Sequence, residues 1–285
     1  MENIDGFLFL DKEEGITSQT ADIQIKRKLG QKKVGHLGTL DPFATGLLLL
    51  GLGEATKFLP LLSDGEKTYV AHLILGKTTD SLDKTGTFTE EKEIPSFDQN
   101  RLECVLNSFL GKQKQEVPLY SAKHINGERS YVLLRKGIDF TPPTVDIEIK
   151  RIKLLSYDRE SISFETTVSK GTYIRSLGRD IAARLGTVGY LDSLRRTEVS
   201  PFSVKDAKKV DEITKEDVMD ILSLFPSIKK IEADGELLHR VEHGNEIRFD
   251  AEDDHLFFLS GGKLLALYEK KGYHHYGCKR GISHA

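Results

Sequence analysis

Hydrophobic residues recur along the first 110 residues with two periods, one typical of strands and one typical of helices. The short apolar run Phe7–Leu10 predicts a strand. A helix is predicted over Ser18–Leu29, capped by Thr17 or Ser18 and ended by the glycine that follows. The uninterrupted run Leu47–Leu50 predicts a second strand, buried on both faces.

The middle of the chain continues this mixture of strands and helices. Strand-like runs predict strands at Tyr69–Leu75, Val145–Leu155 and Ile162–Val168. One apolar helical stripe is closed by Gly111 and consists of Leu102, Val105, Leu106, Phe109 and Leu110. A second helix is predicted over Tyr173–Leu185, with a shared apolar face of Ile174, Leu177, Ile181 and Leu185. Asn126-Gly127 predicts a tight turn.

The C-terminal quarter has a different character. A capping box at Thr214–Asp217 predicts a last helix that buries Val218, Ile221, Leu222 and Phe225. After Pro226 the chain reads as short strands separated by Gly and Asp-Gly turns. We therefore expect one domain over residues 1–228 and a small β-rich domain over residues 229–285.

The composition is that of a globular protein. The chain has 285 residues, of which 38% are hydrophobic and 30% charged. Its N-terminus lacks the pattern of a signal peptide and no apolar run reaches the ~18 residues of a membrane span, so we expect a cytoplasmic protein. Cys104 and Cys278 are far apart, and His239 and His243 have no acidic or thiolate companions, so we expect no metal site.

The net charge of −3 speaks against a general nucleic-acid binder, but the cations are unevenly distributed. Residues 24–36 contain five cations and no acid: Lys26, Arg27, Lys28, Lys32 and Lys33. A second group comprises Lys170, Arg175, Arg179, Arg184, Arg195 and Arg196. Such groups are most often solvated faces, and phosphate contact is the alternative.

The stretch "GHLGTLDPFATGLLLLGLGEATKF", from Gly35 to Phe58, places Asp41 among glycines and before an apolar strand. Asp41-Pro42 could simply start a helix. The surrounding glycines favour another interpretation, because glycine is used where the backbone turns sharply or approaches another group closely. An acid on such a loop, backed by a packed strand, is typical of a positioned reactive group.

This stretch closely resembles the segment around the catalytic aspartate of the TruB family of tRNA pseudouridine-55 synthases. Further blocks resemble the same family in the same order over residues 4–205: "DGFLFLDKEEGITS", "KTYVAHLILGKTTDSLDKTG", "PLYSAKHINGERSY", "SKGTYIRSLGRDIAARLG" and "YLDSLRRTEVS". The sequence departs from the family at "DKEEG", where a proline usually follows the lysine, and we expect this to change loop stiffness.

The resemblance implies a fold and a reaction. The fold would be α+β, with a central mixed, mostly antiparallel sheet flanked by helices and a small C-terminal PUA-like module. The reaction would isomerise a uridine in the T loop of tRNA to pseudouridine after base flipping, without a cofactor or metal. The partner would be the tRNA T stem-loop; we expect no membrane partner, no obligatory protein partner and a monomer.

The resemblance also assigns roles to individual residues. Asp41 would be the nucleophile, Arg175 its ion-pair partner, and Tyr69 the residue that stacks on the base and is implicated in removing the C5 proton. His36 would take the place of the flipped base in the T loop. The remaining substrate-binding residues would be Lys12, Tyr173, Leu194, Lys32 and Lys33.

Arg175 carries an independent indication. It falls in the first turn of a predicted helix, where the helix dipole disfavours a cation, and local rules are broken most often at functional sites. The alternative is a surface arginine with a nearby acid.

Two other functions fit parts of the sequence. A nucleotide-binding enzyme is suggested by Gly51-x-Gly53 after a strand, although Thr56 stands at the third glycine position and no GK[ST] follows. The alternative on the same scaffold is a non-catalytic RNA-binding or tRNA-folding protein. Its weakness is that binding a polyanion needs no carboxylate on the binding face.

Overall fold

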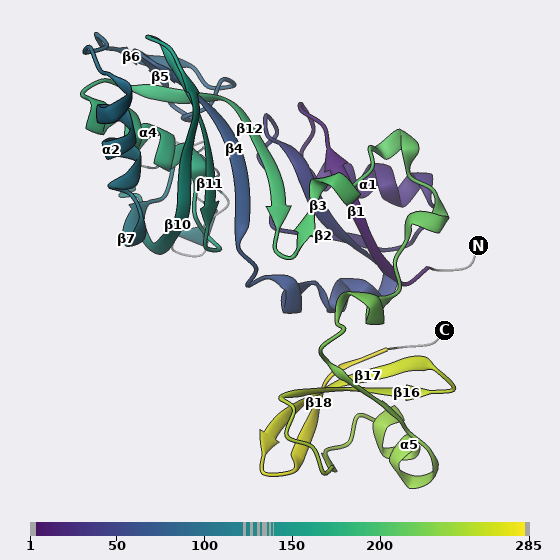
Figure 1. The fold of residues 1–285 in the computed structure, drawn as a ribbon. Helices are drawn as coiled ribbons and strands as arrows, with labels where there is room; N and C mark the ends of the chain where they lie inside the picture. Colours follow the sequence, from purple (N-terminus) through teal and green to yellow (C-terminus); the bar gives the residue numbers. More distant parts are fainter. Residues whose placement is uncertain are drawn as a thin grey trace.

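The computed structural model describes residues 4–282, apart from 122–123, 126–127, 130–131, 133–135, 137 and 139. Over this range the chain forms two main sheets, a large one and a smaller C-terminal one (Figure 1). The predicted turn at Asn126-Gly127 lies outside the described residues. The strands that it would join, β8 (His124–Ile125) and β9 (Glu128–Arg129), pair antiparallel.

The large sheet has nine described strands in the order β1-β3-β12-β4-β11-β10-β7, with β2 beside β3 and β13 beside β12. Their bounds are β1 (Gly6–Lys12), β2 (Val34–Leu37), β3 (Thr45–Leu52), β4 (Lys67–Leu75), β7 (Gly111–Glu116), β10 (Thr144–Tyr157), β11 (Ser161–Val168), β12 (Gly189–Val199) and β13 (Phe202–Ser203). Among these, β12 runs parallel to β3 and the other pairs are antiparallel. The expected mixed, mostly antiparallel sheet is confirmed.

Strands β1 and β3 are buried on both faces, which explains their continuous apolar runs. Phe7, Phe9, Leu47 and Leu49 pack toward the C-terminal sheet and the segment leading to it. The residues that alternate with them pack against helix α1 (Ser18–Lys28). As expected, Thr17 caps α1 by accepting a hydrogen bond from the Thr20 amide.

Two more helices cover the other half of the large sheet (Figure 1). Helix α4 (Ile174–Leu185) begins one residue later than predicted, with Tyr173 as its N-cap. Helix α2 (Gln99–Asn107) is shorter than predicted, and Leu110 is 46% exposed rather than part of the apolar stripe. The reason is that Gly111 already starts strand β7, so the two residues after Ser108 form a connection.

The prediction of a helix after the capping box at Thr214 is wrong. The capping box exists, but the element that it begins is a 3-10 turn, η5 (Lys215–Asp217). A second 3-10 turn follows, η6 (Ile221–Leu224). Between the turns, Met219 exchanges two backbone hydrogen bonds of 2.8 Å with Phe7. A helix would use these amide and carbonyl groups internally, so pairing with β1 holds the segment extended.

The C-terminal sheet has the order β14-β16-β17-β18-β15, with bounds β14 (Lys229–Glu232), β15 (Ile247–Arg248), β16 (His255–Ser260), β17 (Lys263–Gly272) and β18 (His275–Gly281). Helix α5 (Gly235–Glu242), which the strand pattern did not predict, packs beside it. The sheet meets the rest of the molecule through Phe225, whose ring lies 6.0 Å from that of Phe7 and 5.8 Å from that of Phe257.

The remaining described elements are short. They are a hairpin of β5 (Lys77–Thr79) and β6 (Phe88–Glu91), and the 3-10 turns η1 (Gly53–Lys57), η2 (Leu59–Leu62), η3 (Val204–Asp206) and η4 (Val210–Glu212). Within the described ranges, no helix has the length and apolar character needed to cross a lipid bilayer.

Replacing Phe225 by alanine should destabilise the protein, because its buried ring joins β1 to β16. We expect the free energy of unfolding to fall by about 3 kcal/mol or more in urea denaturation. Tyr273→Ala is the control, since Tyr273 is 85% exposed and its loss should change stability by less than about 0.5 kcal/mol. Equal effects of the two variants would contradict this role of Phe225.

Candidate active site

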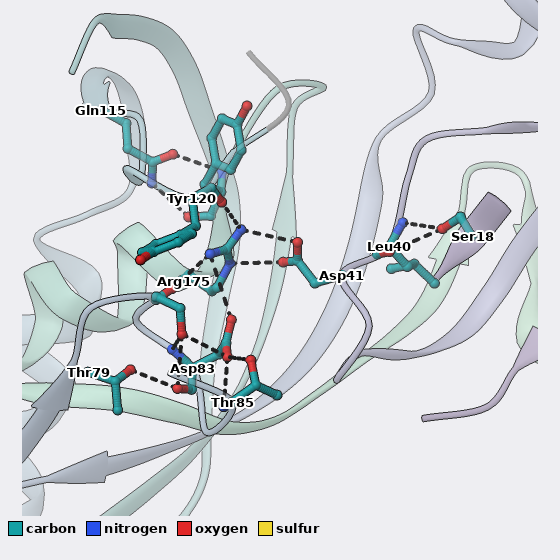
Figure 2. A network of polar contacts seen from close by, with 11 residues as sticks. Ser18, Leu40, Asp41, Thr79, Asp83, Thr85, Gln115, Tyr120 and Arg175 are labelled. Carbon is teal, nitrogen blue, oxygen red and sulfur yellow. Dashed lines mark hydrogen bonds and ion pairs between the residues drawn. The ribbon is translucent and has the colours of Figure 1, made fainter. Parts of the chain in front are cut away.

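Asp41 lies on the loop between β2 and β3, and its neighbours on that loop are held from both sides. Ser18, at the start of α1, accepts a hydrogen bond from the Leu40 amide (2.9 Å) and donates one to the Leu40 carbonyl (3.1 Å) (Figure 2). The Pro42 carbonyl accepts a hydrogen bond of 2.8 Å from the Gly15 amide. Asp41 therefore sits between two fixed residues, which limits how far its carboxylate can move.

A glycine at the end of this loop allows the two parallel strands to meet. Gly46 has φ +103°, and a Cβ on it would lie 2.2 Å from the carbonyl oxygen of Arg196 on β12. Any side chain there would separate β3 from β12. The close approach inferred from the glycine-rich sequence is thus present at this position.

Lys12 was expected to line the substrate pocket, and the structure places it elsewhere. Its side chain is fully buried beneath the Asp41 loop, where Nζ donates to the carbonyls of Glu13 (2.8 Å), Ile16 (2.8 Å) and Pro42 (3.4 Å). Burial lowers the pKa of Lys12 to about 8, although the charge of Asp41 opposes this shift. Lys12 is therefore placed to fix the loop from below rather than to touch a ligand.

Arg175 reaches Asp41 from the first turn of α4, 134 positions further along the chain. Its Nε donates to Oδ2 of Asp41 (2.9 Å) and its Nη2 to Oδ1 (3.1 Å), forming the bidentate pair expected from the sequence. The guanidinium side chain is 5% exposed, whereas the carboxylate side chain is 35% exposed. The cation is thus internal, and the anion remains accessible.

The remaining donors of Arg175 are also occupied within the described part of the chain. Nη1 donates to the Ser81 carbonyl (2.7 Å) and lies 3.7 Å from Oδ2 of Asp83, while Nη2 donates to the Tyr120 carbonyl (2.9 Å) (Figure 2). Asp83 in turn accepts hydrogen bonds from the amide and hydroxyl of Thr85. A guanidinium held on every side has a single orientation, and this orientation fixes Asp41.

The start of α4 is itself anchored to strand β7. The buried side chain of Gln115 accepts a hydrogen bond from the Tyr173 amide (2.8 Å) and donates one to the Tyr173 carbonyl (3.1 Å). Tyr173 precedes Arg175 by two residues. This contact therefore sets where the helix begins and where the arginine lies.

A cavity of about 420 Å³ opens beside the ion pair. It is lined by residues 38–41 of the loop, by β4 and β12, and by the segment that leads into α4. Tyr69, Tyr173 and Leu194 are among the residues that line it. Burial raises the pKa of the Tyr173 hydroxyl.

Besides Lys12, three predicted substrate-binding residues lie outside this cavity lining. His36, on β2, forms contacts through its ring nitrogens with Asp22 (2.7 Å) and Thr39 (3.2 Å). Lys32 and Lys33 are exposed residues just before β2. The structure thus brings Asp41, Tyr69, Tyr173, Leu194 and Arg175 together, and leaves these three on the approach to the loop.

The sequence alone did not identify several residues that build the site: Lys67, Ser81, Asp83 and Gln115. It also did not show that Arg196 lines the cavity. Arg196 was grouped with surface cations, but it is 1% exposed and donates to the carbonyls of Leu47 (2.7 Å) and Gly38 (2.9 Å). Strand alternation offered one signal for Lys67, which stands two residues before Tyr69. For Asp83, the signal was an acid on a loop that stands two residues after Ser81 and two before Thr85.

The glycines after β3 do not form a nucleotide-binding turn. Gly53 opens η1, a 3-10 turn of five residues, and the Glu54 amide already donates to Asp5 (2.7 Å). The Gly53 amide donates to the Lys33 carbonyl (2.9 Å), so both N–H groups that could meet a phosphate here already have partners. Within the described ranges, no group of three or more His, Cys, Asp or Glu side chains could hold a metal ion.

The fold matches known structures over most of its length. A chain of a structure described as a Cbf5–Nop10–Gar1 complex superposes with a TM-score of 0.68, covering 94% of this chain and 79% of that chain at 23% identity. The two chains therefore share a class of fold.

Sequence comparison defines the family within that class. The family described as TruB family pseudouridylate synthase (N terminal domain) matches residues 26–174. A tRNA pseudouridine synthase B of Thermosipho melanesiensis is 38% identical, covering 92% of this chain and 90% of its relative. One of Syntrophobacter fumaroxidans is 40% identical, covering 88% and 84%. The chain belongs to the TruB family of pseudouridylate synthases.

Replacing Gln115 by alanine should loosen the start of α4. The Tyr173 amide would lose its partner in a buried setting, so we expect stability to fall by about 1–3 kcal/mol and activity to fall with the displacement of Arg175. Thermal or urea unfolding measures the first effect. Lys114→Ala, an exposed neighbour on the same strand, is the control and should leave both quantities unchanged.

The buried ammonium of Lys12 predicts a pH dependence of stability. Its pKa is about 8 in the folded protein and 10.5 ordinarily, so between these values the unfolded chain binds more protons. Stability conferred at this position must therefore rise with pH across that window. We expect the free energy of unfolding of the wild type, measured relative to Lys12→Met, to increase from pH 7.5 to about 10. A flat difference would show that Lys12 is not perturbed.

Proposed function

We propose that this protein is a tRNA pseudouridine synthase that isomerises uridine 55, in the T loop, through an aspartate-dependent mechanism. The observation that carries the proposal is the bidentate pair of Asp41 and Arg175 at the edge of a cavity. The printed names of the relatives, tRNA pseudouridine synthase B, support the substrate.

The reaction requires that one bond break and another form within the same nucleotide. The bond from ribose C1′ to N1 of uracil breaks, the base turns, and C1′ bonds to C5. The proton on C5 leaves to a base and N1 ends as N–H, so the product is an isomer of the substrate. Because atoms and electrons balance, no redox partner or second substrate is required.

Asp41 is placed to act as the nucleophile. Its carboxylate is accessible from the cavity, and the two hydrogen bonds from Arg175 direct its oxygens. Attack at ribose C1′ or at uracil C6 makes the same demand on the protein. In either case the carboxylate must stay in place while the ring detaches and turns.

Tyr69 and Leu194 form the surface on which the base would rest. Tyr69 is 7% exposed and lies on β4, with Leu194 on neighbouring β12. Stacking of a base on an aromatic ring contributes about 1–3 kcal/mol, enough to hold an everted uracil but not to extract it. We assign removal of the C5 proton to the Tyr69 hydroxyl.

A cavity of this kind can receive only a base that has left its stack, so the substrate should be an RNA loop. His36, with Lys32 and Lys33 nearby, lies on the approach to the Asp41 loop. We assign to His36 the place vacated by the flipped base, and to the two lysines contact with backbone phosphates.

We further propose that residues 1–228 form the catalytic domain and residues 229–285 a short PUA-like RNA-binding domain. We propose that the protein acts as a monomer and needs no obligatory protein partner. Action on tRNA places the enzyme in the cytoplasm. The alternative, a non-catalytic RNA-binding protein, has no comparable support, because it leaves the accessible carboxylate without a use.

Replacing Asp41 by asparagine should abolish pseudouridine formation, because an amide is not a nucleophile of this kind. RNA binding should stay within a few-fold, since no charge that attracts phosphate is lost. The assay is incubation with an unmodified tRNA transcript, followed by chemical mapping of pseudouridine.

The control for this prediction is Asp98→Asn. Asp98 caps α2 by accepting a hydrogen bond from the Arg101 amide, and asparagine caps helices about as well as aspartate. This variant should convert the transcript at the wild-type rate. Conversion by Asp41→Asn would rule out the proposed mechanism.

A further inference from the structure

The floor of the cavity carries two cations beside its aromatic residue. Lys67 and Tyr69 stand two positions apart on β4, so their side chains share one face of the sheet. Arg196 on β12 is the direct cross-strand partner of Tyr69 and shares that face. All three line the cavity.

The two cations converge on a small space above Gly38. A Cβ on Gly38 would lie 3.3 Å from Nη1 of Arg196 and 3.5 Å from Cε of Lys67. Gly38 itself has φ +68°, a conformation that favours glycine. The absence of a side chain at this position leaves room between the two cations, three residues before Asp41.

This pair of charges has little compensation from the protein. Among the described residues, neither Lys67 nor Arg196 forms an ion pair with a carboxylate, and Lys67 donates one hydrogen bond, to the Gly65 carbonyl (3.1 Å). The nearby acid, Asp64, is itself paired with Lys170. Burial, and then the charges of Arg196 and Lys170, lower the pKa of Lys67, so an anion at this point would be stabilised.

At the Asp41 end of the cavity, negative charge exceeds positive charge. There, Arg175 faces two carboxylates, Asp41 and Asp83. A ligand with an anionic group at one end would therefore be oriented with that group toward Gly38 and its neutral part toward Asp41. A nucleotide within an RNA chain has this form, with a phosphate beside a neutral sugar and base.

We propose that Lys67 and Arg196 form an anion subsite above Gly38 that binds a backbone phosphate next to the target uridine. The inference rests on the proposed function and adds to it a positioning contact. Arg196 is already fixed by its bonds to Leu47 and Gly38, so it contributes a preset charge. Lys67 is the member that can be replaced with least effect on the loop.

The test compares wild type with Lys67→Gln, Lys67→Arg and Lys77→Gln on a synthetic T-arm stem-loop. Lys77 is the matched control, because it lies on β5, just beyond the opposite end of β4 from Lys67, and is 52% exposed. We expect Lys67→Gln to lower kcat/KM about 10-fold and to reduce the salt dependence of binding by about 0.7 in slope. Lys67→Arg should stay within about three-fold, and Lys77→Gln should match the wild type.

Neutral methylphosphonates, placed in turn on the 5′ and 3′ sides of the target uridine, identify the phosphate. At one of the two positions the methylphosphonate should lower the kcat/KM of the wild type about 10-fold, while the kcat/KM of Lys67→Gln should show no additional loss. The subsite is overturned if the losses caused by Lys67→Gln and by the methylphosphonate multiply at both positions. It is also overturned if Lys67→Gln keeps the binding and the salt dependence of the wild type.

Failure of the proposed function would show separately, as a wild-type protein that leaves the transcript unmodified. The subsite is then judged by titrating wild type and Lys67→Gln with uridine monophosphate and with uridine, followed by NMR. Tighter binding of the monophosphate by wild type, lost in Lys67→Gln, supports the subsite. Equal binding of both compounds by wild type overturns it. Unchanged melting curves confirm that the variants are folded.

Discussion

The arrangement of the site depends on the ion pair of Asp41 with the buried guanidinium of Arg175. A guanidinium that is almost fully buried must have its donors satisfied, and those of Arg175 draw together the Asp41 loop, the Ser81–Asp83 turn and the Tyr120 carbonyl. Breaking such a pair leaves an uncompensated charge, which is costly. The pair therefore positions the Asp41 carboxylate and also joins segments that are distant in sequence.

The rest of the fold holds the two partners of this pair in place. On one side, β3 is packed on both faces and Ser18, Gly15 and Lys12 fix the loop that precedes it. On the other side, Gln115 fixes the start of α4. Neither anchor touches the cavity directly, so the precision of the site comes from residues that a ligand never meets. The Phe225 ring extends the support to the C-terminal sheet.

Local patterns predicted the elements whose side chains agree with their surroundings. Strand β3, helix α1 with its Thr17 cap, and helix α4 all follow from apolar spacing and capping. The segment after Thr214 misled the prediction because a valid capping signal was overridden by backbone pairing with β1. Arg196 stands in a group of cations that is most often a solvated face, and Lys12 was expected to bind substrate, yet both are buried because backbone carbonyls accept their hydrogen bonds.

By itself, the sequence determined the class of fold, the family resemblance and Asp41 as the candidate nucleophile, because these are carried by contiguous motifs and by local periodicity. Only the tertiary structure decided which cations face the cavity, which residues support it from behind, and that Asp83 is a second carboxylate on Arg175. The physical reason is that burial and charge pairing depend on contacts between segments distant in sequence, such as Arg175 and Ser81, which are 94 positions apart, and no local pattern encodes such contacts.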